Sequence, residues 1–294
     1  MPKEKGHSLW GDAWRRLRRD RVAMVCLGLV VVYTLLAVYG EITYQYNTFK
    51  DQTPTYSVVH LDDAYTPPNA AHWMGTDGLG RDVMARLVQG VRIAYKVGII
   101  TSFIAIPIGV ILGCLAGFFG GRVDDFIVWL YSTFASMPGL LFILAIAMVV
   151  PGKGLLGVYL GIGLTTWVGL CRLVRGEVLK HKEQTYVQAA KALGLGSGRI
   201  MFKHILPNIT HVIIVTFTLR FPAAVGTEVF MSFLGIGVQN EPSWGLMINS
   251  ARMRLWQGMW WEMTFVTIAL FLLVLAFNLL GDALRDALDP RLND

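Results

Sequence analysis

Two ionisable residues lie inside one apolar stretch of the sequence and are well placed to do chemistry there. Arg220 and Glu228 both fall within the apolar segment 209–234. An ionised group in hydrocarbon costs about 3 kcal/mol or more unless it meets water or a partner. In a helix, eight residues separate the two by ~12 Å along the axis and by about 80° around it, too far for a direct ion pair. Each therefore needs another partner, and both are candidates for a polar path through a membrane.

Motifs for enzymatic chemistry are missing from the sequence. It has no Gly-x-Ser-x-Gly, no His-Glu-x-x-His and no two aspartates facing each other within apolar segments. The string Gly152-Lys153-Gly154 lacks the other residues of a phosphate-binding loop. The six histidines show no pair at metal-ligand spacing within one helix. We therefore expect no catalytic residue, metal or cofactor on this chain, and we interpret the three cysteines as small packing residues: Cys26, Cys114 and Cys171.

Composition indicates an integral membrane protein. The 294 residues are 54% hydrophobic and only 16% charged, and the mean hydropathy is +0.51. A soluble core of this size would need more polar cover. Apolar runs long enough to cross a ~30 Å hydrocarbon layer as helices predict six spans, at 22–39, 95–119, 126–150, 155–173, 209–234 and 260–280. The fold class is therefore an all-α polytopic membrane protein with six transmembrane helices.

Basic residues are distributed unevenly among the connecting segments. Seventeen of the 26 lysines and arginines fall in residues 1–21, at Arg122, in 172–208 and after residue 281, whereas seven fall in the alternate loops. This bias predicts that both termini are cytoplasmic. Five arginines precede the first span without a small-residue cleavage site, so we interpret that span as an anchor rather than a removed signal. The net charge of +6 needs no nucleic acid, because anionic lipid headgroups would hold these arginines.

Small residues and prolines mark the predicted spans. Gly109, Gly113 and Gly117 recur every four residues, which predicts that another helix approaches closely along that side. Prolines remove helical hydrogen bonds and predict bends at Pro107, Pro138 and Pro222.

A long polar insertion follows the first span and ends in the string Gly-Thr-Asp-Gly-Leu-Gly-Arg-Asp, residues 75–82. Asp77 can cap the turn before Gly78, and Arg81, Asp82 and Arg86 recur at helical spacing. We expect a helix here that lies along the membrane surface, with apolar surroundings for Val83, Met84 and Leu87. Two roles are open for it: bracing the entry to the second span, or contacting a substrate or a binding protein.

A basic segment, 172–208, separates the fourth and fifth spans. It can form a short helix with one apolar face, ended by Gly194 in the C′ position. A second short helix can start at Ser197, and Pro207 suits the first turn of the next span. This pattern indicates a segment that grips another protein, the alternative being an ordinary amphipathic connector. The predicted apolar face comprises Tyr186, Val187, Ala190 and Leu193.

Together these motifs resemble those of ABC importer permeases of the oligopeptide/dipeptide (peptide/nickel) class, specifically the C-type subunit. Segment 172–208 resembles the Glu-Ala-Ala…Gly…Ile-x-Leu-Pro loop that docks into the ATP-binding subunit, with Gln188 where most of the family has Glu. Residues 75–82 resemble the Gly-Thr-Asp-x-x-Gly-Arg-Asp signature of this branch, and 232–245 resemble its Ser-Phe-Leu-Gly-x-Gly…Pro-x-Trp-Gly stretch. The resemblance covers nearly the whole chain except 41–70, and it implies the type I ABC importer permease fold.

The resemblance also implies three groups of site residues. The ATPase-coupling residues are Tyr186, Gln188, Ala189, Ala190, Gly194, Ile205, Leu206 and Pro207. The translocation path would include Arg220, Glu228, Pro138 and Ser136, and for Arg220 a peptide carboxylate and an ion pair with the companion permease are alternative partners. The outer surface or gate would include Gly75, Asp77, Arg81, Asp82 and Trp244.

The implied partners are a second permease subunit, two ATP-binding subunits that carry ATP and Mg, an extracytoplasmic substrate-binding protein and membrane lipid. The chain would then form half of the translocation path for peptides in a bacterial cytoplasmic (inner) membrane. Nickel complexes, glutathione or sugars are alternative solutes of the same branch. From other classes, an ion-coupled secondary carrier and an intramembrane enzyme are the alternatives.

The predicted organisation along the chain has five parts. They are a basic cytoplasmic N-terminus (1–21), a first transmembrane helix (22–40), an extracytoplasmic insertion with a surface helix (41–93), a five-helix permease core (94–281) that contains the cytoplasmic coupling loop 172–208, and a cytoplasmic C-terminus (282–294).

Overall fold

A computed structural model describes residues 9–151 and 154–288 of the chain, so Gly152 and Lys153 of the Gly-Lys-Gly string lie outside the described residues. All regular elements of the described residues are helices or helical turns, with one isolated bridge between Thr76 and Asp82 and no strand. The all-α fold class is therefore confirmed.

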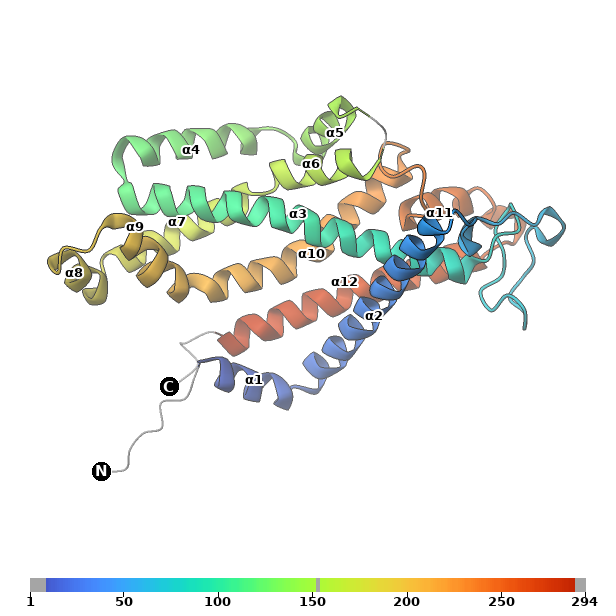
Figure 1. The fold of residues 1–294 in the computed structure, drawn as a ribbon, viewed down its shortest axis with the longest axis horizontal. Helices are drawn as coiled ribbons and strands as arrows, with labels where there is room; N and C mark the ends of the chain where they lie inside the picture. The colour runs from blue at the N-terminus through green and yellow to red at the C-terminus, as the bar shows by residue number, and fades with distance from the viewer. Residues whose placement is uncertain (1–8, 152–153, 289–294) are drawn as a thin grey trace.

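Long helices run side by side and set the long axis of the molecule (Figure 1). Within residues 9–151 and 154–288, five segments are long and apolar enough to cross a membrane. They are α2 (Arg21–Phe49), α3 (Val83–Phe119), α6 with α7 (Leu155–Thr165 and Val168–Lys182), the run from α9 (Ser197–Ile200) to α10 (Thr210–Phe233), and α12 (Trp261–Leu288). The helices α4 (Gly121–Ser136) and α5 (Gly139–Val149) make a sixth span if the two count as one.

The predicted span over 126–150 is divided into two helices, because α4 and α5 meet at an angle of 92°. The predicted bend at Pro138 is confirmed. Pro138 has no amide hydrogen to continue the helix, and a residue before proline is pushed out of the α region. Met137 is accordingly extended, with φ −86° and ψ 141°. Ser136 and Pro138 lie exposed at this break.

The first two spans also differ from the prediction. The helix α2 continues to Phe49, ten residues beyond the predicted end of the first span at 39. A separate helix on the membrane surface is absent, because α3 starts at Val83 and runs unbroken to Phe119. The charged residues expected on that surface helix belong instead to the turn that starts α3.

Close packing of α3 against α7 follows from the predicted glycine repeat. A Cβ atom at Gly109, Gly113 or Gly117 would lie 2.7–2.9 Å from a backbone oxygen of α7 or of Trp167 just before it. Only glycine permits that approach, so the prediction of a tight helix contact is confirmed. Cys114 and Cys171 lie buried along these two helices as free thiols, in agreement with their interpretation as packing residues.

The two ends of the bundle are built differently. At one end, α8 (Thr185–Ala192) and α9 protrude beyond the long helices (Figure 1). At the other end lie α11 (Trp244–Arg252) and a segment that we call the cap, residues 50–82. Short helical turns are η1 (Thr55–Ser57) and η2 (Leu61–Asp63) in the cap, η5 (Leu255–Gln257) after α11, and the pair η3 (Met201–Ile205) and η4 (Leu206–Ile209) before α10.

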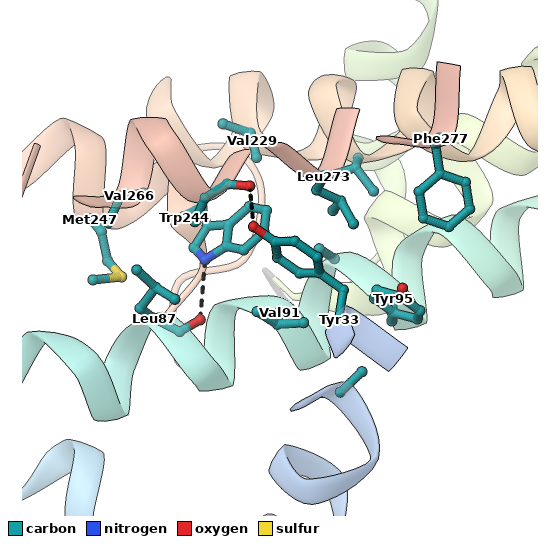
Figure 2. Close-up of a cluster of buried hydrophobic side chains, with 14 of the residues drawn as sticks. Tyr33, Leu87, Val91, Tyr95, Val229, Trp244, Met247, Val266, Leu273 and Phe277 are labelled. Atoms are coloured by element: carbon teal, nitrogen blue, oxygen red, sulfur yellow. Dashed lines mark hydrogen bonds between the residues drawn. The ribbon is translucent and has the colours of Figure 1, made fainter. Parts of the chain in front are cut away.

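A buried cluster joins α2, α3, α11 and α12 near the cap end (Figure 2). Trp244 is 1% exposed, and its indole N–H donates to the Leu87 carbonyl at 3.2 Å. The hydroxyl of Tyr33 donates to the Ala269 carbonyl at 2.8 Å, tying α2 to α12. Trp244 is therefore buried at the cap end rather than exposed on an outer surface, and its ring fills the space beside Gly90, where a Cβ atom would collide with it.

Candidate functional site

The segment that we call the elbow, residues 185–209, is built from a helix, a glycine corner and a second helical run. The helix α8 ends in a Schellman motif: the amide of Gly194 donates to the Lys191 carbonyl at 2.9 Å and that of Leu195 to the Ala190 carbonyl at 3.2 Å. Gly194 has φ +76°, a conformation that favours glycine. The prediction that Gly194 ends the first helix in the C′ position is confirmed.

The second helical run begins at Ser197, as predicted, and continues without a gap into α10. Pro207 cannot donate the hydrogen bond that a regular helix would need at that position. The chain there passes through a π-helical turn, η3, and a 3₁₀ turn, η4, that contains the proline. The amide side chain of Asn208 donates to the His204 carbonyl at 2.6 Å, which satisfies one carbonyl that this irregularity frees.

The inner face of the elbow packs onto the ends of α3 and α7. Val187, Ile200 and Ile205 are each at most 1% exposed and share one apolar cluster with those helices. Two of the residues expected to couple to a partner, Ala190 and Ile205, belong to this inner face, so their contacts are within the chain. The α3 and α7 residues of the cluster are Val110, Cys114, Phe118, Leu170, Val174 and Val178.

The outer face of the elbow is exposed and partly apolar. The expectation that Leu193 shares a face with Val187 is wrong, because Leu193 is 80% exposed. Phe202 is 55% exposed, and Tyr186 contacts His181, with 2.9 Å between the hydroxyl and Nδ1. Partial burial raises the pKa of the Tyr186 hydroxyl, which keeps it neutral. Of the remaining expected coupling residues, Leu206 is half-buried, whereas Gln188, Ala189, Gly194 and Pro207 are exposed.

Arg220 is held at the break between α6 and α7. Its guanidinium donates to the carbonyl of Thr166 and, at 2.5 Å, to the Thr166 hydroxyl. Thr166 is the C-cap of α6, so the cation lies at the negative end of a helix dipole, which stabilises it. The Arg220 Nε has no hydrogen-bond partner among the described residues. The contact between Arg220 and Thr166 lies within the chain and could not be predicted from the sequence.

Glu228 is 1% exposed and lies in the interior of the chain, not on its surface. Ser232, one turn along α10, donates to its carboxylate at 2.6 Å, and the amide of Val238 donates to the Ser232 hydroxyl at 3.0 Å. The prediction that Arg220 and Glu228 take separate partners agrees with these contacts. Glu228 therefore ties α10 to the turn after it.

The string 75–82 folds into the turn that starts α3. Asp77 is 4% exposed, accepts from the amides of Leu79 and Arg81 at 2.9 and 3.0 Å, and pairs with the Arg81 side chain at 2.8 Å. Asp82 caps α3 through the amide of Ala85, and the indole of Trp261 donates to the Thr76 carbonyl. These contacts favour the bracing role. Of the residues expected at the outer surface or gate, Gly75 and Asp77 are buried, whereas Arg81 and Asp82 are half-buried.

A second polar centre, which sequence reasoning missed, lies where α2 and α3 meet the segment before α11. Arg92 is 1% exposed and pairs with Glu241 and, at 3.5 Å, with Glu41. Lys96 pairs with Glu41 at 2.7 Å, and the Arg92 guanidinium lies 3.8 Å from the centre of the Tyr44 ring. A signal was present in the sequence, since Arg92 and Lys96 are four residues apart at the edge of an apolar span.

Comparison with known proteins explains this architecture. Residues 109–294 match the family described as binding-protein-dependent transport system inner membrane component, and residues 8–68 match the N-terminal TM domain of oligopeptide transport permease C. The chain belongs to this family of transport permeases. It is a multi-span transmembrane permease of the ABC importer class, and the predicted resemblance is confirmed. Permeases of this family are not themselves catalytic.

Relatives cover nearly the whole permease. It is 40% identical to the dipeptide transport system permease protein DppC of Bacillus subtilis (strain 168), over 96% of this chain and 85% of that one. It is 39% identical to the oligopeptide transport system permease protein OppC of the same organism, over 98% and 92%. It is 36% identical to the glutathione transport system permease protein GsiD of Pectobacterium atrosepticum, over 96% and 91%.

A solved structure shares the fold of the permease. A chain from inward-facing conformations of the MetNI methionine ABC transporter superposes with a TM-score of 0.58 at 19% identity, over 70% of this chain and 98% of that one. The predicted ABC importer permease fold is confirmed by this likeness.

Proposed function

We propose that this permease forms one half of a translocation path for peptides and that separate ATP-binding subunits drive it through the elbow. Peptides are the substrate class because the DppC and OppC relatives are named for dipeptide and oligopeptide transport. The other partners are a second permease subunit and an extracytoplasmic substrate-binding protein. The permease then lies in the cytoplasmic (inner) membrane with both termini in the cytoplasm, as the distribution of basic residues favours.

One observation carries the proposal: the elbow has a buried inner face and an exposed apolar outer face. Exposed apolar groups outside the predicted spans indicate a protein partner, and Leu193 and Phe202, which precede the predicted span 209–234, are such groups. The elbow stands at the end of the bundle, where a subunit outside the membrane can reach it (Figure 1). ATP and Mg would be bound by that partner and not by this chain.

The packing of the elbow suggests how it transmits motion. The Schellman corner at Gly194 fixes α8 relative to α9. Val187 and Ile205 lie in one cluster with residues of α3 and α7, so a displacement of the outer face is passed to those two helices. Close packing makes such a contact stiff. Closure of the ATP-binding subunits would then move α3 and α7. The ATP-binding site of the partner and the translocation path would thereby be linked by a coupling free energy.

A pair of matched substitutions tests the partner. Leu193→Asp places a charge on the outer face of the elbow, and Leu61→Asp makes the same change at a residue of similar exposure, 67%, in the cap. We expect Leu193→Asp to lower co-purification of ATP-binding subunits and ATP hydrolysis at least about tenfold, because a charge would be buried in the contact, while Leu61→Asp leaves both unchanged. Equal co-purification of ATP-binding subunits with both variants would overturn the proposal, as would uptake driven by an ion gradient alone.

We further propose that Arg220, with Ser136 and Pro138, lines the path and that Arg220 attracts the carboxylate of a peptide. The Arg220 side chain is half-buried, and its buried Nε is a donor with no hydrogen-bond partner among the described residues, which supports a further partner for this guanidinium. Glu228 acts from the interior by holding α10. Arg220→Leu is expected to lower uptake of a labelled dipeptide about tenfold or more, the worth of a charged hydrogen bond, and to abolish preference for the dipeptide over its C-terminal amide. Unchanged uptake and preference would exclude the role.

A further inference from the structure

Helix α1 (Leu9–Arg19) is a short helix that packs against α12 at the side of the bundle. Leu17 is 5% exposed and shares a cluster with Ala276 and Leu280 of α12. At the junction with α2, the Asp20 carboxylate accepts hydrogen bonds from the amides of Val22 and Ala23, at 2.8 and 3.2 Å, which starts α2. The position of α1 relative to the first span is therefore fixed on two sides.

The side of α1 that faces away from α12 is basic. A helical turn of 3.6 residues places Arg19 about 200° and Arg18 about 100° around the axis from the buried Leu17, and both arginines are exposed. Arg21, the first residue of α2, is also exposed. Residues 9–21 hold five arginines against two aspartates, a net charge of +3, in which Asp20 keeps its negative charge while it caps α2. The outward side therefore carries a concentrated positive charge.

This charge lies directly before the apolar run of α2. Val22 and Val25 follow directly on α2 and are 57% and 65% exposed, which places apolar side chains against lipid. Figure 1 shows α1 and α2 along the same flank of the molecule, beside α12. Trp14 is 49% exposed on α1, and tryptophan favours the interface between hydrocarbon and water. Arg18, Arg19 and Arg21 thus lie one to four residues before the first exposed apolar residue of α2, Val22.

We infer that the face formed by Arg18, Arg19 and Arg21 binds the headgroup phosphates of anionic phospholipids. A guanidinium matches phosphate geometry through paired N–H groups, and clustered arginines beside a span favour a lipid of net negative charge over a zwitterionic one. The inference rests on the proposed function in one respect, the choice of leaflet. With a cytoplasmic N-terminus, the lipids bound are those of the inner leaflet. A neighbouring acidic protein surface is the competing occupant, and continuity with the lipid-facing side of α2 favours the lipid.

Lipid selectivity around Trp14 tests this inference. The full chain is placed in nanodiscs of phosphatidylcholine with a small fraction of phosphatidylglycerol brominated near the headgroup end of its acyl chains. The fluorescence of the Trp14→Phe variant is subtracted from that of the unmodified chain, which isolates the fluorescence of Trp14. The extent to which bromine quenches this fluorescence reports the local enrichment of phosphatidylglycerol. The triple variant Arg18→Gln/Arg19→Gln/Arg21→Gln removes the charge. The matched control, Lys180→Gln/Lys191→Gln/Lys203→Gln, removes three exposed charges at the elbow end of the molecule.

We expect the triple arginine variant to reduce the enrichment about fivefold or more, since each arginine near the surface adds to the attraction, and the lysine control to leave it unchanged. High salt should lower the enrichment around the unmodified chain, because salt screens exposed charges. Equal enrichment in both triple variants overturns the inference, as does enrichment that is insensitive to salt. Loss of ATP-binding subunits from the arginine variant at unchanged enrichment overturns it in favour of a protein partner. The enrichment of phosphatidylglycerol is measured on this chain without ATP-binding subunits. A failure of this inference can therefore be distinguished from a failure of the proposed function.

Discussion

The two ends of this permease are held together by different forces. At the elbow, the contact with the long helices is apolar: Val187 and Ile205 are completely buried, and the charged residues of the segment lie outside. At the cap end, the interior contains charges, and Arg92, Glu228 and Asp77 are 1%, 1% and 4% exposed. The same set of long helices therefore connects an apolar joint to a polar one.

This difference has mechanical consequences. Apolar burial is non-directional and depends on area, so an apolar joint can follow small rotations of its neighbours. Buried ion pairs require particular partners, and separating one member leaves an uncompensated charge. We infer that the elbow is suited to pass on movement and that the polar centre around Arg92 is suited to hold α2, α3 and the segment before α11 in register.

The largest effect is expected from breaking the polar centre. Arg92→Leu leaves Glu41 with Lys96 as its ion-pair partner and removes the ion-pair partner of Glu241. We expect a loss of roughly 3–5 kcal/mol in the free energy of unfolding, the usual result of removing one member of a buried pair, seen as a lower thermal unfolding temperature in detergent. Adding Glu241→Leu to this variant should restore part of the stability.

A matched substitution sharpens this test. Arg252 is exposed, and its guanidinium lies 4.8 Å from the centre of the Phe233 ring. Arg252→Leu should therefore cost less than about 1 kcal/mol, the worth of an exposed cation–π contact. If Arg92→Leu were as mild as Arg252→Leu, buried charge would not be what holds the cap end together.

Local features of the fold were predictable from the sequence, and contacts between distant segments were not. The corner at Gly194 and the close contact along Gly109, Gly113 and Gly117 follow from residue types at fixed spacing, and both are confirmed. Pairing of Arg92 with Glu241 joins residues 149 apart, and the Trp244 hydrogen bond joins residues 157 apart. No periodicity within one segment encodes such a pairing, so the burial of Trp244 could not be predicted from the sequence.

The candidate site shows the same limit. Helical spacing placed Val187 and Leu193 on one face, but six residues span an arc wide enough for one to be buried and the other exposed. Pro138 signalled a bend in the third span, but a proline does not fix its size, and the neighbours of α4 and α5 decide that it reaches 92°. The partner of Arg220 at the end of α6 likewise depends on how α6 and α10 pack.

A smaller effect is expected from substitutions in the apolar joint at the elbow. There, one substitution should change the stability of the fold and another the binding of ATP-binding subunits. Ile205 is completely buried, so Ile205→Ala should lower the free energy of unfolding by about 3 kcal/mol through the cavity it leaves. Phe202, three residues away and 55% exposed, lies on the outer face. Phe202→Ala should leave the unfolding temperature unchanged and weaken retention of ATP-binding subunits. Measuring both quantities for both variants tests whether the elbow has one face for the bundle and another for a partner. If Phe202→Ala lowered the unfolding temperature as much as Ile205→Ala, the two faces would not be distinct, because both side chains would then stabilise the same joint.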